Sequence, residues 1–251
     1  MNLKKTLFTL MIALTIIPMP TLAKESENLE KFEVVAETTK YYKTVINNNL
    51  RENMLLNVNS SITTEITKEE YELSTSENLT RGNGISETNY KKLVTSILSN
   101  GNLYRYKATL TWKQFPVVRS YDSIAIGHYS NVKYNSNFNF TQTYCLTSGT
   151  CKTLTTYYPQ YFTSGGSATF KVPEGSLSSL SQTIFFDVTK NTNATINTQK
   201  AYGDYSHATE TVSVNQAKNF IAGTAGIQFN DNTSLYYDDI APATATWSGA
   251  W

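Results

Sequence analysis

The stretch "KKLVTSILSNGNLYRYKATLTW", Lys91–Trp112, decides the fold class. Two runs of alternating residues flank Asn100-Gly101, which is the strongest short-range signal for a β-hairpin. A two-residue loop would pair Ser99 with Asn102. One face of the hairpin would then carry Leu93, Thr95, Ile97, Tyr104, Tyr106, Ala108, Leu110 and Trp112. A slip by one residue would turn the opposite, Lys- and Arg-containing row inward, so the alternation predicts an antiparallel sheet with one buried face.

Further short runs with the composition of strands follow this hairpin and are separated by Gly, Pro and Asn turns. They cover residues 123–129, 137–145, 151–158, 168–172, 182–189, 207–214, 226–229 and 243–247. No strand–helix–strand rhythm interrupts them. Many short strands with turns between them predict a mainly β protein, an antiparallel β-sandwich.

The N-terminal part has a different composition. Residues 24–95 carry 21 charged side chains in 72 positions, whereas residues 96–251 carry 18 in 156. Ser26 is a candidate helix N-cap, and Leu29, Phe32 and Tyr42 recur at roughly helical spacing. We therefore expect an N-terminal helix over about residues 27–46, which either docks on the sheet or forms an arm or leader. The expected division is a signal peptide over 1–23, a charged, partly helical segment over 24–89, and a β-sandwich domain over 90–251.

The first 23 residues have the three parts of a secretory signal peptide. Lys4 and Lys5 precede an apolar run, and the small residues of Thr21-Leu22-Ala23 follow it. The run is too short for a stable membrane span, so we expect cleavage after Ala23 and secretion. Without the two leader lysines the chain has 19 basic and 20 acidic residues and is close to neutral. It therefore lacks the broad positive charge that is typical of nucleic-acid-binding proteins.

Cys145 and Cys151 are the only cysteines in the chain. In an oxidising compartment such a pair is most often a disulfide. Free thiols and a metal or redox site are the alternatives, but the only histidines, His128 and His207, do not have the spacing of a zinc site. We predict a disulfide that fixes the register of two strands, 138–144 and 152–158.

Sequence motifs for catalysis are lacking: there is no nucleophile elbow, zinc-protease motif, phosphate loop or EF-hand. No metal and no cofactor are therefore expected. Asp204, Ser206, His207 and Glu210 lie together in "AYGDYSHATE", and a hydrolase that uses His128 or His207 is one alternative function. Three acids flank "NTSLYY", which forms either a solvated turn or a cation site: Asp231, Asp238 and Asp239.

Aromatic side chains are the strongest candidates for a binding surface. The chain has 17 tyrosines, more than a core needs, because each buried hydroxyl requires a partner. The candidate ligand-binding residues are Tyr157, Tyr158, Tyr161, Tyr236, Tyr237 and Trp251. They indicate a secreted, non-enzymatic protein whose partner is an extracellular or cell-surface ligand, with carbohydrate as one candidate.

The first alternative, ahead of the hydrolase, is a secreted β-pore-forming or toxin-like protein. Residues 163–189 resemble in pattern a Ser/Thr-rich membrane-insertion hairpin. Lys171 and Pro173 interrupt this segment, which disfavours membrane insertion.

Overall fold

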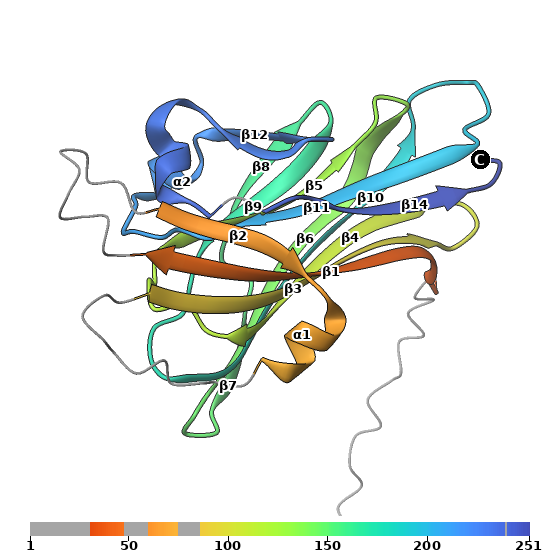
Figure 1. The fold of residues 1–251 in the computed structure, drawn as a ribbon. Helices are drawn as coiled ribbons and strands as arrows, with labels where there is room; N and C mark the ends of the chain where they lie inside the picture. The colour runs from red at the N-terminus through yellow and green to blue at the C-terminus, as the bar shows by residue number, and fades with distance from the viewer. Residues whose placement is uncertain (1–30, 48–59, 75–85, 239) are drawn as a thin grey trace, which may run out of the picture. The chain divides into compact units, whose positions relative to one another are not determined.

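The computed structural model describes residues 31–47, 60–74, 86–238 and 240–251. These residues form two antiparallel sheets and a separate hairpin (Figure 1). In spatial order, the seven-stranded sheet consists of β2 (Ser60–Ile66), β1 (Glu33–Asn47), β3 (Ser86–Ser99), β4 (Tyr104–Gln114), β10 (Leu177–Lys190), β6 (Val132–Leu146) and β7 (Cys151–Leu154). The prediction of a mainly β, antiparallel protein is confirmed.

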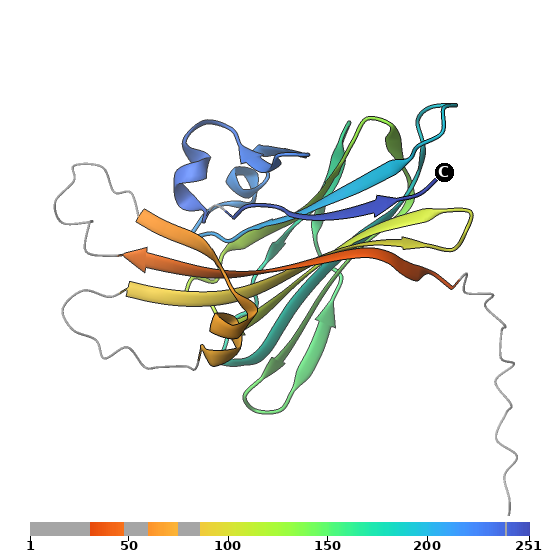
Figure 2. The same ribbon diagram turned by 45° about the vertical axis from the view of Figure 1, so that its right-hand side comes forward.

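The second sheet has five strands, in the order β14 (Ala243–Ser248), β11 (Thr198–Ser206), β5 (Tyr121–His128), β9 (Gly165–Lys171) and β8 (Tyr158–Phe162). A short hairpin of β12 (Phe220–Gly223) and β13 (Gly226–Phe229) packs on this sheet, as Figure 2 shows together with the helix α2 (Val214–Ala217). The remaining helical elements are α1 (Lys68–Leu73) and a 3₁₀ helix, Asp231–Tyr236.

One hydrophobic core is built from the facing sides of the two sheets. The seven-stranded sheet contributes residues such as Leu93, Tyr106 and Leu110, and the five-stranded sheet contributes residues such as Ile124 and Phe170. All five side chains are buried. This two-layer arrangement agrees with the predicted sandwich, because each sheet covers the apolar face of the other.

The hairpin of β3 and β4 has the predicted faces but not the predicted register. All eight residues predicted for the inner row are buried. However, Ser99 pairs with Tyr104 instead of Asn102, so the loop is longer by two residues. The Asn100 side-chain oxygen accepts hydrogen bonds from the backbone N–H groups of Asn102 and Leu103, at 3.0 and 2.7 Å, and this stabilises the longer loop. A shift by two residues leaves every side chain on its own face.

The predicted N-terminal helix is wrong over residues 33–46, which form most of strand β1; residues 27–30 lie outside the described residues. β1 pairs with β3 along its length and with β2 on its other side. Burial alternates with period two, and Tyr42 and Thr44 are the most deeply buried of the inward row. Val, Thr and Tyr favour strands, and pairing with two neighbours outweighs the weak helical spacing.

Two further differences concern the later strands. The strand predicted at 207–214 is wrong, because the strand of that region is β11, Thr198–Ser206, and residues 207–213 form a connection that ends at α2. Residues 163–189 do not form a hairpin, since β9 and β10 belong to different sheets. The pattern that resembles an insertion hairpin is therefore divided between the two layers. In the described part of the chain, no helix is long and apolar enough to cross a membrane.

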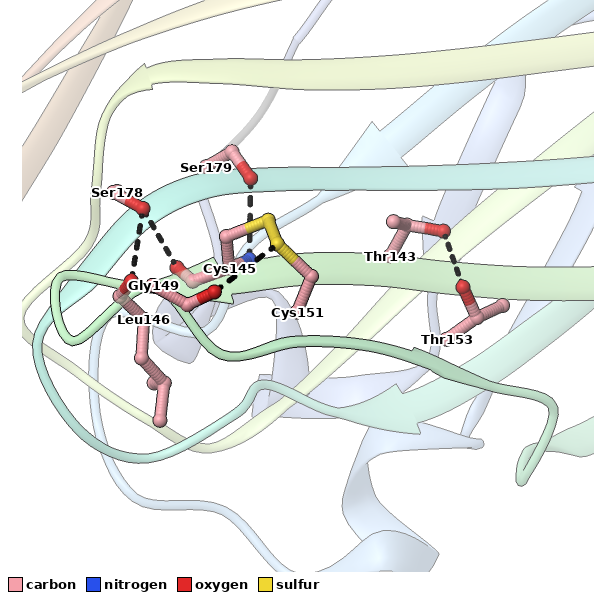
Figure 3. Close-up of a disulfide and its surroundings, with 8 residues drawn as sticks. All are labelled: Thr143, Cys145, Leu146, Gly149, Cys151, Thr153, Ser178 and Ser179. Carbon is pink, nitrogen blue, oxygen red and sulfur yellow. Dashed lines mark hydrogen bonds between the residues drawn. A yellow bond between two sulfur atoms is a disulfide. The ribbon is translucent and has the colours of Figure 1, made fainter. Parts of the chain in front are cut away.

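The predicted Cys145–Cys151 disulfide is confirmed (Figure 3). The two cysteines face each other directly in the pairing of β6 and β7, with their Cα atoms 4.0 Å apart. Two positions further along the ladder, the hydroxyl groups of Thr143 and Thr153 lie 3.2 Å apart. Ser179 on β10 pairs with Cys145, and its hydroxyl accepts a hydrogen bond from the backbone N–H of Cys145, at 3.1 Å. The disulfide thus fixes the edge strand β7 onto the sheet in one register.

Candidate functional site

Four aromatic side chains meet where the edge of one sheet approaches the edge of the other. We call Tyr134, Phe138, Tyr157 and Tyr161 the edge aromatic cluster. β6 supplies the first two, β8 supplies Tyr161, and Tyr157 directly precedes β8. The ring of Tyr161 lies 5.0 Å from that of Phe138 and 5.1 Å from that of Tyr134, centre to centre. Tyr157 stacks on Phe138 at 5.9 Å.

The edge aromatic cluster packs on the protein core on one side and is exposed to solvent on the other. Phe138 stacks on the buried Phe186 at 6.0 Å, with the rings nearly parallel. Gly166, which pairs with Tyr161, leaves the space that the Phe138 ring uses: an added Cβ would lie 2.9 Å from that ring. Tyr161 is 55% exposed and Tyr134 is 36% exposed. Exposed rings held by a rigid base form a pre-organised surface for stacking on a ligand.

A cavity of about 520 Å³ borders the edge aromatic cluster. Residues 161–164 line one side of it, and residues of the β12–β13 hairpin, 221–226 and Gln228, line the other. Tyr161 thus belongs both to the cluster and to the cavity. Among the described residues, no charged side chain lines this cavity. Its wall offers Thr, Ser and Gln side chains, together with backbone groups and the 54% exposed Ile221.

Burial and neighbouring phenol groups change the pKa values of two tyrosines in the cluster. The pKa of Tyr161 and that of Tyr157 are both raised, first by partial burial and then by the neighbouring tyrosines. The phenol groups therefore stay protonated and act as hydrogen-bond donors at neutral pH. Neither the four rings of the cluster nor the described lining of the cavity includes a charged side chain.

The remaining predicted aromatic residues lie elsewhere. Tyr158 is 41% exposed but points to the other face of β8, toward Tyr121 and the ammonium group of Lys218. Tyr237 is buried, stacks on Phe229 at 4.1 Å, and donates a hydrogen bond to a backbone carbonyl. Tyr236, partly buried, packs against the same small apolar cluster as Tyr237.

Trp251 is not among the residues that line the cavity, and it contacts a different part of the structure. Its ring lies 4.6 Å from that of Tyr104, and its backbone pairs with that of Ile196 through two hydrogen bonds of 3.0 Å. Of the six predicted residues, the structure places Tyr157 and Tyr161 in the edge aromatic cluster, whereas Tyr236 and Tyr237 lie in a separate apolar cluster. Sequence reasoning missed Tyr134 and Phe138 as site residues, although Phe138 lay on a predicted strand whose alternation indicated which way it points.

His207 does meet an acid and a hydroxyl, but not the neighbours that the sequence suggested. Its Nδ1 atom lies 3.0 Å from both carboxylate oxygens of Asp122, and the Tyr205 hydroxyl also donates to that carboxylate. All three side chains are buried, and burial raises the pKa of Tyr205 well above its usual value. A substrate has no access to this group, so its geometry supports a structural role.

The other acids and the second histidine are also held in structural contacts. Asp204 accepts hydrogen bonds from the backbone N–H groups of Tyr205 and Ile227, at 2.7 and 2.5 Å. His128 is buried, and its Nδ1 donates to the Tyr129 carbonyl oxygen at 2.8 Å. Within the described residues, no group of three or more His, Cys, Asp or Glu side chains could hold a metal ion. The Asp238 carboxylate faces the interior, and Asp239 lies outside the described residues.

Comparison with known proteins does not assign this chain to a family. No protein-family model and no curated protein sequence matches it. Among solved structures it is similar to the C-terminal domain of the AgI/II polypeptide BspA of Streptococcus agalactiae, at 10% sequence identity and a TM-score of 0.26. That alignment covers 67% of this chain and 80% of the streptococcal chain. A similarity of this size carries no functional assignment.

Proposed function

We propose that this protein is a secreted, non-enzymatic β-sandwich that binds a neutral, hydroxyl-rich extracellular ligand, a glycan, at the edge aromatic cluster and the adjoining cavity. The observation that carries this proposal is the position of Tyr161: its half-exposed ring belongs to the cluster, and the residue also lines the cavity. A sugar ring presents an apolar face and a hydroxyl rim. Tyr161 and Tyr134 would stack on the face, and the Thr, Ser and Gln side chains of the cavity would bond the rim.

The uncharged lining supports this ligand class over the others. Nucleic acid and acidic polymers are bound mainly through Lys and Arg, and the described lining of the cavity has neither. A purely apolar ligand would leave the backbone and hydroxyl groups of the cavity wall without partners, at a cost in binding free energy. A neutral carbohydrate satisfies both parts of the surface.

Binding to immobilised neutral polysaccharides, measured by surface plasmon resonance with the full chain, tests the proposal. Tyr161→Ala should weaken binding by about 5- to 30-fold, since the loss of one aromatic contact with the ligand costs about 1–2 kcal/mol. Tyr161→Phe should retain most of the affinity, because it keeps the ring.

Tyr158→Ala is the matched control, since Tyr158 lies on the same strand with a similar exposure but points to the other face. It should bind as the wild type does. Equal losses in Tyr161→Ala and Tyr158→Ala, or no binding of the wild type to any neutral polysaccharide, would contradict the proposed site.

Secretion is tested separately. N-terminal sequencing of the protein recovered from culture medium should begin at Lys24, the residue after the proposed cleavage site. An intact leader on the released protein would contradict the proposed processing.

A further inference from the structure

A lysine and an aspartate are buried against each other in the interior of the protein. Lys91 lies on β3 in the inward row that continues through Leu93. Asp238 follows the 3₁₀ helix and precedes β14. The Lys91 ammonium donates directly to Asp238 Oδ2, and both side chains are fully buried. The two residues are 147 positions apart in the chain.

The surroundings of this pair are arranged around the Asp238 carboxylate. Oδ1 accepts a hydrogen bond of 2.8 Å from the backbone N–H of His207. Oδ2, which contacts Lys91, also accepts a bond of 3.3 Å from the Thr44 hydroxyl. Thr44 in turn lies 2.9 Å from the hydroxyl of the partly exposed Thr63.

Aromatic rings enclose the Lys91 side of the pair. Its ammonium nitrogen lies 5.2 Å from the centre of the Trp112 ring and 5.9 Å from that of Tyr205. The Asp122–His207 pair contacts the same two rings: the His207 ring lies 5.2 Å from that of Trp112, and the Tyr205 hydroxyl donates to the Asp122 carboxylate. In such an enclosure the two groups have little access to water and depend on each other and on the neighbouring hydrogen bonds for partners.

We propose that Lys91 and Asp238 are joined by an intramolecular amide bond between their side chains. A proton passes from the Lys91 ammonium to the Asp238 carboxylate, which leaves a neutral amine beside a carboxylic acid. The Lys91 nitrogen then attacks Cγ of Asp238, the C–N bond forms, and the bond from Cγ to Oδ2 breaks. Oδ2 leaves as water with the acid proton and one proton from the nitrogen. The reaction releases one water molecule and requires no other reactant.

The hydrogen bonds around Asp238 suit this reaction. The His207 backbone N–H stabilises Oδ1 while negative charge develops there, and it then remains bonded to the amide oxygen. The Thr44 hydroxyl donates toward Oδ2, the leaving oxygen, and connects it to Thr63 near the surface. Burial holds the two groups in contact, so the reaction is intramolecular and needs little further ordering.

Peptide mapping of the wild-type protein tests the bond directly. Trypsin does not cleave after an acylated lysine, so the peptide from Gly82 should extend to Lys92. Mass spectrometry should find this peptide joined to the tryptic peptide that begins at Asn219, with the mass of one water missing. Fragmentation should place the junction at Lys91 and Asp238. Linear peptides of full mass at both positions would overturn the proposal.

Variants provide the matched controls. Lys91→Arg and Asp238→Ala should lose the branched peptide entirely, whereas Lys92→Arg, a change at the adjacent position on the opposite face, should keep it. Asp238→Asn should give the same branched peptide as the wild type, because loss of ammonia in place of water leaves an identical amide. A branched peptide that persists in Lys91→Arg would also overturn the assignment.

Discussion

A methyl group added at Gly127 tests how the β12–β13 hairpin closes the cavity. Gly127 lies in β5, and an alanine Cβ at this position would lie 1.9 Å from the carbonyl oxygen of Gly223 and 2.2 Å from its carbonyl carbon. Both contacts are with backbone atoms, so no side-chain rotation relieves them. We therefore expect Gly127→Ala to displace the tip of the hairpin, which forms one wall of the cavity.

The magnitude follows from comparing two ways to relieve this clash. Ordinary contact begins near 3.4 Å, so Gly223 must move by the difference between 3.4 and 1.9 Å, about 1.5 Å. Such overpacking costs about 1–3 kcal/mol. Complete detachment would instead expose the buried side chains of Phe220 and Ile227, at about 1.5–3 kcal/mol each. Displacement is the cheaper response, so the free energy of unfolding should fall by about 1–3 kcal/mol.

Urea denaturation and amide hydrogen exchange measure the two parts of this prediction. In Gly127→Ala, exchange should accelerate in residues 220–229 while the central strands β4 and β10 keep their protection. Ala125→Gly is the control: it removes a methyl group from the same face of β5, and it should cost only about 0.5–1 kcal/mol without displacing the hairpin. Wild-type exchange and wild-type stability in Gly127→Ala would refute the close approach of the two backbones.

Three further predictions concern stability. Burial lowers the pKa of His128 below its usual value of 6.5. As the pH falls through about 6.5, His128 therefore becomes protonated in the unfolded chain before it does so in the folded protein. The free energy of unfolding falls by up to ~1.4 kcal/mol per pH unit until the pKa of the folded state is reached. His128→Asn should show a shallower dependence in denaturation experiments between about pH 8 and pH 5. Replacing Cys145 and Cys151 with Ser should lower the free energy of unfolding by about 2 kcal/mol, measured by calorimetry without reductant, because the closed loop is short; an unchanged transition would contradict this. Asp238→Ala should cost at least ~3–5 kcal/mol because it strands the Lys91 charge, and the double change to Lys91→Met and Asp238→Leu should cost less than this single change in urea denaturation.

The hairpin at Asn100-Gly101 shows which features the sequence alone could predict. The faces of β3 and β4 follow from alternation, because burial of one face requires every inward residue to have the same parity. The register depends on the loop, and there the Asn100 side chain replaces a backbone partner and lengthens the turn. Sequence statistics for Asn-Gly favour the two-residue loop, and they do not include this local competition.

Strand β1 shows why the sequence of the N-terminal part predicts a helix where the chain forms a strand. Its inward row includes Thr38, Lys40 and Thr44, so the alternation of a strand is hidden by polar side chains. Each has a specific use: Thr38 donates to the Thr244 carbonyl, Lys40 pairs with Glu65, and Thr44 bonds Asp238. These partners are distant in sequence, and an apolar-periodicity search does not detect them.

The candidate site was predictable only in part for the same reason. Tyr157 and Tyr161 stood out because they are close in sequence and rich in aromatic neighbours. Their partners Tyr134 and Phe138 come from β6 in the other sheet, and the cavity needs the β12–β13 hairpin as its second wall. Contacts between strands of different sheets depend on topology, which local patterns do not specify.

Lys91 carried a usable signal, since it continues the inward row of Leu93, Thr95 and Ile97 by one more step. A lysine at a core position requires a partner that satisfies its polar group.

The energetics of the Lys91–Asp238 pair favour a covalent partner. As separate ions, Lys91 and Asp238 each incur several kcal/mol of desolvation cost, which their attraction offsets only approximately. As an amide, the pair is neutral, so that cost disappears. The bond also closes a loop of 147 positions, for which the chain-entropy model gives about 5 kcal/mol of stabilisation. The covalent state thus explains how the interior accommodates a fully buried lysine beside a fully buried aspartate.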